Sequence, residues 1–252
     1  MSETASPATA RRTFWHHVNV AELLMLLALI VALVPFARYG WRVIAYAYPV
    51  DYGEGPLLDQ VRRLVALQSI YRADLSSPPF VIANYPPIFP LVQVPFYLIF
   101  GPAFWYGRAI AWFATIVAAA FLGLTVHAVT RDWIAGIVSG LLLLAIPYVL
   151  AWAPLNRVDA LALALSWAGL FVLTRWSDRR RGLIWGAILL TAAVYTRQSY
   201  GLAAPFAAFV WLLHRRPWTR AFALAGLVAG LGGAAFLLLN AITRGGFFYN
   251  IV

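Results

Sequence analysis

The chain has 252 residues, of which 63% are hydrophobic and only 11% are charged. Soluble domains carry about 25% charged residues, so this composition excludes an ordinary soluble domain and indicates a membrane protein. The net charge of +10 comes from 19 basic residues, all of them arginine. They lie at the ends of apolar runs and form no continuous basic face, which argues against a nucleic-acid partner. The absence of cysteine excludes disulfides and thiolate chemistry.

The apolar runs predict an all-α polytopic membrane protein. A helix needs about 20 apolar residues to cross a bilayer. Residues 1–19 are polar and lack a signal-peptide cleavage site, so we expect a cytoplasmic tail there. Eight apolar runs follow, at residues 20–37, 86–100, 106–128, 133–153, 159–174, 183–196, 200–213 and 221–241. We expect seven of them to cross, and doubt only the run 86–100, which is short and contains four prolines.

The arginines indicate which loops face the cytoplasm, because short cytoplasmic loops carry an excess of basic residues. Arginines cluster in the amino-terminal tail, at 175–181 and at 215–220. An even number of crossings must separate these clusters, and this holds only if 86–100 does not cross. We therefore predict that 86–100 is a juxtamembrane helix on the outer face, within an outer loop at 39–105. Five of the nine acidic residues then lie outside, namely Asp51, Glu54, Asp59, Asp74 and Asp159.

The same outer loop contains a second candidate helix. Residues 56–71 place leucine and valine at helical spacing, with charged side chains elsewhere around the helix. That pattern is typical of an amphipathic helix lying in the membrane interface.

Two carboxylates near the outer end of the first span are candidates for catalysis. Asp51 and Glu54 stand beside glycines, which let the backbone approach a ligand closely. A carboxylate in this place could take a proton from an acceptor hydroxyl, as sugar transfer requires. The alternative is a polar loop with incidental acids.

Further ionisable residues lie at predicted outer ends of spans, where such residues tend to line polar cavities. Arg157 and Asp159 precede one span, and they either line a cavity or simply pair with each other. Arg197 interrupts an apolar stretch and is suited to bidentate binding of a phosphate, or else anchors a lipid headgroup. Arg108 is equally well explained as an anchor or a cavity residue. No histidine–carboxylate metal site is visible.

Polar motifs recur in a definite order along the chain: Asp51–Glu54, Asn84–Pro87, Gly107–Arg108, Asn156–Asp159 and Thr196–Arg197. In this order they resemble the first half of the GT-C glycosyltransferase superfamily. The likeness is closest to members that use polyprenyl-phosphate sugars, such as protein O-mannosyltransferases and the lipid A aminoarabinose transferase.

The resemblance implies roles for individual residues. A carboxylate, Asp51 or Glu54, would activate the acceptor. The family's two acids are usually adjacent, whereas these are three positions apart; we favour Asp51. Asp159 would line the same cavity, with Arg157 and Arg108 beside it. Arg197 would hold the lipid phosphate of the donor. Tyr85, which takes a place where the family often has a charged residue, is counted with the donor-binding residues.

We therefore expect residues 1–252 to form a single transmembrane domain, the front half of a longer GT-C-like enzyme in the cytoplasmic (inner) membrane. Its reaction would transfer a sugar from a polyprenyl phosphate to a lipid, glycan or protein acceptor at the outer face. Whether a divalent metal takes part in the reaction is left open. The alternatives are a transporter or flippase for a lipid-linked precursor and a noncatalytic GT-C-like scaffold.

Overall fold

The computed structural model of the chain describes residues 20–74, 76, 78, 80 and 82–251, so the predicted tail lies outside the described residues. All regular secondary structure in these residues is α-helical. The helices are α1 (Val20–Ala45), α2 (Glu54–Val65), α3 (Ile88–Phe100), α4 (Trp105–Thr130), α5 (Trp133–Ala145), α6 (Pro147–Trp152), α7 (Asp159–Trp176), α8 (Arg180–Val194), α9 (Gln198–Arg215), α10 (Trp218–Ile242) and α11 (Gly246–Ile251).

Within the described part of the chain, three helices are long and apolar enough to cross a membrane: α1, α4 and α10, with 26, 26 and 25 residues. At 1.5 Å per residue each exceeds the roughly 30 Å of bilayer hydrocarbon. The apolar side chains of α1 and α10 are largely exposed, as Leu23 and Leu237 illustrate, and α4 exposes part of one face, including Phe113. Exposed apolar surface of this kind is stable against lipid and not against water, so the protein is an α-helical membrane protein.

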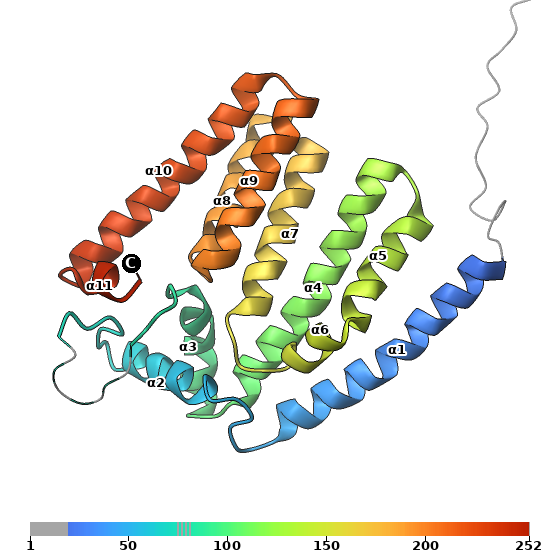
Figure 1. Ribbon diagram of the computed structural model, residues 1–252. Coiled ribbons are helices and arrows are strands. Elements are labelled where there is room, and N and C mark those ends of the chain that lie inside the picture. The colour runs from blue at the N-terminus through green and yellow to red at the C-terminus, as the bar shows by residue number, and fades with distance from the viewer. Residues whose placement is uncertain (1–19, 75, 77, 79, 81, 252) are drawn as a thin grey trace, which may run out of the picture.

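The helices pack side by side in a layered bundle (Figure 1). α7 packs against α4 and α8, α4 against α5, α5 against α1, and α10 against α8 and α9. The turns α4–α5, α7–α8 and α9–α10 lie at one end of the bundle and carry many of the arginines. The opposite end holds α2, α3, α6 and α11, together with the predicted outer acidic residues.

Glycines allow α4 and α5 to approach each other closely. A Cβ added at Gly123 would lie 2.7 Å from the carbonyl oxygen of Gly136, and one added at Gly140 would lie 2.7 Å from that of Ala119. Small residues at such crossings are typical of helix packing in membranes.

The outer-loop helices differ in detail from the prediction. α3 begins at Ile88, close to the predicted 86–100, and it packs against α2 at the end of the bundle. The helix predicted at 56–71 instead spans Glu54–Val65. It ends there because Leu67 adopts a left-handed backbone with φ of 54°, and the Leu67 side chain, expected on the apolar face, is 96% exposed.

The run 133–153, predicted as one span, is divided into α5 and α6. The break falls at Ile146, whose backbone is extended, with φ −64° and ψ 122°. Pro147 follows and opens α6. A proline disfavours helical backbone in the residue before it, which explains the break.

Candidate functional site

Charged side chains from three distant parts of the chain meet at the end of the bundle that holds α2. We call Asp51, Arg157, Asp159 and Arg197 the charged row. Arg157 Nη1 lies 2.7 Å from Asp51 Oδ2, and Arg157 Nε lies 3.4 Å from Asp159 Oδ2. Arg197 Nη1 pairs with Asp159 Oδ1. Carboxylates and guanidinium groups thus alternate along the row, and the charges of these four residues sum to zero.

Asp51 occupies the first position of the row, in the loop between α1 and α2. Its Oδ2 accepts hydrogen bonds from Arg157 Nη1 at 2.7 Å and from the backbone N–H of Gly53 at 2.9 Å. Within the described residues, the hydrogen bonds to this carboxylate all fall on Oδ2. The side chain is 13% exposed, so solvent and ligands reach it in part.

Arg157 is the central cation of the row. Its guanidinium lies 4.9 Å from the ring centroid of Trp152 and 5.8 Å from that of Tyr52. Burial lowers the pKa of Arg157, but the hydrogen bond and charge of Asp51 outweigh it and hold that pKa above its ordinary value. Sequence reasoning missed both aromatic residues, because aromatic residues near span ends are common anyway as interfacial belts.

Arg197 occupies the last position, at the start of α9. Its guanidinium lies 5.8 Å from the ring centroid of Tyr85, so the predicted donor residues Arg197, Asp159 and Tyr85 do meet. The neighbouring Gln198 donates a hydrogen bond from Nε2 to the carbonyl of Asn84 at 2.9 Å. These contacts join the α8–α9 turn to the segment that leads into α3.

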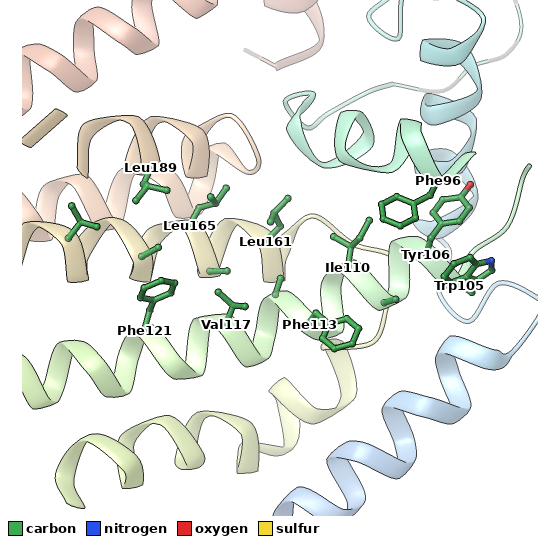
Figure 2. Close-up of a pocket in the computed structure, with 15 residues that line it drawn as sticks. Phe96, Trp105, Tyr106, Ile110, Phe113, Val117, Phe121, Leu161, Leu165 and Leu189 are labelled. Atoms are coloured by element: carbon green, nitrogen blue, oxygen red, sulfur yellow. The ribbon is translucent and has the colours of Figure 1, made fainter. Parts of the chain in front are cut away.

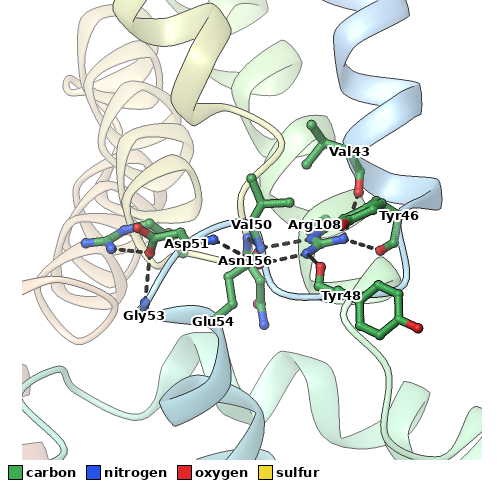
Figure 3. Close-up of polar contacts among 10 residues, drawn as sticks. Val43, Tyr46, Tyr48, Val50, Asp51, Gly53, Glu54, Arg108 and Asn156 are labelled. Carbon is green, nitrogen blue, oxygen red and sulfur yellow. Dashed lines mark hydrogen bonds and ion pairs between the residues drawn. The ribbon is translucent and has the colours of Figure 1, made fainter.

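Glu54 and Arg108 form a separate, fully buried ion pair (Figure 3). Arg108 donates from Nε to Glu54 Oε1 at 2.8 Å and from Nη2 to Oε2 at 2.7 Å. The Glu54 carboxylate also accepts from the backbone N–H groups of Asn156 at 2.9 Å and Val50 at 2.7 Å. Both side chains are 0% exposed, so neither is open to a ligand in this structure.

The environment keeps Glu54 ionised. Burial raises the pKa of Glu54, but the hydrogen bonds from Arg108, Asn156 and Val50 and the charge of Arg108 more than offset it, and the pKa lies below its ordinary value. A carboxylate already satisfied by these four hydrogen bonds is a poor proton acceptor. Of the two acids predicted from the sequence, only Asp51 is therefore partly accessible.

An apolar groove of about 710 Å³ runs along α4 and α7 (Figure 2). Its outer end is formed by Phe96, Tyr106, Ile110 and Leu161, and it continues to Phe121 and Leu189. Ile110 and Leu161 also pack in the cluster that contains Tyr85. The groove therefore begins close to the residue that lies beneath Arg197.

The described residues bring together no group of three His, Asp or Glu side chains of the kind that holds a metal ion. Comparison with family models, with curated proteins and with solved structures gave no match to this chain.

Proposed function

We propose that this chain is a GT-C-like membrane glycosyltransferase with about seven spans. It would transfer a sugar from a polyprenyl-phosphate donor to a hydroxyl of a lipid, glycan or protein acceptor. The observation that carries the proposal is the charged row, because it connects a partly exposed carboxylate to an arginine suited to binding phosphate.

The row provides the two groups that the reaction requires. Asp51 takes the proton of the acceptor hydroxyl, and the acceptor oxygen forms a bond to the anomeric carbon of the sugar. The bond between that carbon and the phosphate oxygen breaks, and its electron pair stays on the departing polyprenyl phosphate. Arg197 stabilises the negative charge that develops there, as a preorganised donor does.

The groove along α4 and α7 supports a lipid-linked donor. Fifteen residues line it, all apolar or aromatic, and two of them, Ile110 and Leu161, pack against the same cluster as Tyr85. A prenyl chain placed in this groove would bring its phosphate toward Arg197.

The distribution of charge supports an active site on the outer face of the cytoplasmic membrane. The arginine-rich turns lie at the end of the bundle opposite the charged row. Because cytoplasmic loops carry the excess of basic residues, the row would face outward and the amino terminus inward.

Substitution of the two ends of the row tests the proposal. In the intact protein, we expect Asp51→Asn to lower transfer from a polyprenyl-phosphate sugar about 100-fold or more, the usual effect of losing a general base. Arg197→Gln should lower it about 100-fold as well, since it removes a charge-stabilising donor. Asp74→Asn, an acid at the same end of the bundle but outside the row, is the matched control and should stay active.

Two results would argue against the assignment. Full transfer activity in both Asp51→Asn and Arg197→Gln would exclude the row as the catalytic site. Translocation of a labelled lipid in liposomes that requires Arg197 but not Asp51, with no sugar transferred, would identify a transporter instead.

A further inference from the structure

The two inner members of the charged row are each shared between two partners of opposite charge. Arg157 contacts Asp51 through Nη1 and Asp159 through Nε. Asp159 contacts Arg157 through Oδ2 and the guanidinium of Arg197 through Oδ1. A change in one pair therefore alters the neighbouring pair.

The two pairs of Arg157 are unequal. The contact with Asp51 is 2.7 Å, while the contact with Asp159 is 3.4 Å. A charge-assisted hydrogen bond is strongest near 2.7–2.9 Å, so the Arg157–Asp159 pair has room to shorten. If Asp159 lost its contact with Arg197, the contact between Arg157 and Asp159 would shorten. The contact between Arg157 and Asp51 would then weaken.

A phosphate at Arg197 would remove that partner. Phosphate and the Asp159 carboxylate both recognise the same guanidinium, so they compete for Arg197. Asp159 would then pair more strongly with Arg157, and Arg157 would hold Asp51 less tightly.

We infer that Arg157 and Asp159 are positioning residues that couple phosphate binding at Arg197 to the freedom of Asp51 to accept a proton. This inference rests on the proposed function of the row. Asp51 is restrained by Arg157 while the phosphate site is empty, and is released as a base when the donor lipid is bound.

Such coupling is reciprocal. If phosphate binding loosens the hold of Arg157 on Asp51, then removing the charge of Asp51 must in turn strengthen phosphate binding. Plain repulsion between Asp51 and the phosphate would also strengthen binding, but it would do so whether or not the row is intact. A double-mutant cycle separates the two.

The experiment measures the dissociation constant of a fluorescent polyprenyl phosphate that carries no sugar. The intact protein is embedded in nanodiscs made of zwitterionic lipid. We expect Asp51→Asn to tighten binding about fivefold or more, the lower range of coupling between sites. In an Arg157→Gln background the same substitution should change binding less than twofold. Asp159→Asn interrupts the row at the next residue and should abolish the effect as well, which provides a second background if Arg157→Gln does not fold.

Equal tightening by Asp51→Asn in all backgrounds, or none in the otherwise unchanged protein, would overturn the coupling. Arg197→Gln separates this failure from that of the proposed function. If Arg197→Gln weakens binding but no coupling is seen, only the inference about Arg157 and Asp159 fails. If binding does not depend on Arg197, the donor site itself is wrong, and the coupling fails with it.

Discussion

Arg108 uses all five N–H groups of its guanidinium. Besides the Glu54 carboxylate, it donates to the backbone carbonyls of Val43 at 2.8 Å, Tyr48 at 2.7 Å and Tyr46. These carbonyls lie at and just beyond the end of α1, where a helix leaves carbonyl groups without partners. The ion pair thus joins the end of α1, the start of α2, α4 and the segment before α7 in one buried network.

Loss of either charge should destabilise the protein strongly. We expect Glu54→Gln or Arg108→Gln to lower the free energy of unfolding by about 3–5 kcal/mol, because each leaves a buried charge without its partner. The double variant should lose less than the sum of the two. Thermal melting in detergent micelles measures this, with Arg62→Gln, at an exposed ion pair, as the control that should change little.

The pH dependence has a definite sign. The folded-state pKa of Glu54 lies below its ordinary value of 4.5, so its stabilising contribution is complete well above pH 4.5 and declines as the pH falls below it. The melting temperature of the unchanged protein should therefore fall with acidification more steeply than that of Glu54→Gln. Parallel curves would show that Glu54 does not contribute in this way.

Among the helices, α4 and α5 approach each other closely along a row of glycines. The backbones of these helices approach at Gly123, Gly136 and Gly140, where an added methyl group would meet a carbonyl oxygen. A backbone atom cannot move aside as a flexible side chain can, so the helices themselves would have to separate. By contrast, a Cβ added at Gly230 in α10 meets nothing within 4 Å.

These two environments give a matched pair of substitutions. We expect Gly140→Ala to lower the free energy of unfolding by about 1–3 kcal/mol through overpacking. Gly230→Ala should leave it unchanged or raise it, since alanine favours helix more than glycine does. Melting curves of both variants, recorded in the same detergent, test the contrast; similar losses in both would mean that the α4–α5 contact is not the cause.

For the whole molecule, the arginine clusters at 175–181 and 215–220 predict its orientation in the membrane. The chain contains no cysteine, so single cysteines can be introduced without background. Phe80→Cys and Ala103→Cys should react with a membrane-impermeant maleimide added to intact cells. Arg181→Cys, in the first turn of α8, should react only after permeabilisation. If Phe80→Cys or Ala103→Cys failed to react in intact cells, the prediction that the segment containing α3 stays on the outer side would be contradicted.

Much of the architecture is predictable from local sequence. Hydropathy locates the long apolar helices α1, α4 and α10, and the proline-rich composition of 86–100 agrees with a short α3 beside α2. The end of α2 and the break at Ile146 were misjudged, because apolar periodicity continues past both points while the backbone does not.

The sequence by itself therefore determined that this is a helical membrane protein, and that clusters of arginine mark the loops at 175–181 and 215–220. Only the tertiary structure decided which charges meet. Glu54 pairs with a residue 54 positions away, and Asp51 with one 106 positions away. Hydropathy and spacing are properties of neighbouring residues, whereas ion pairs across such distances depend on how α2, α4 and α7 pack. That packing buries Glu54 and leaves Asp51 partly exposed.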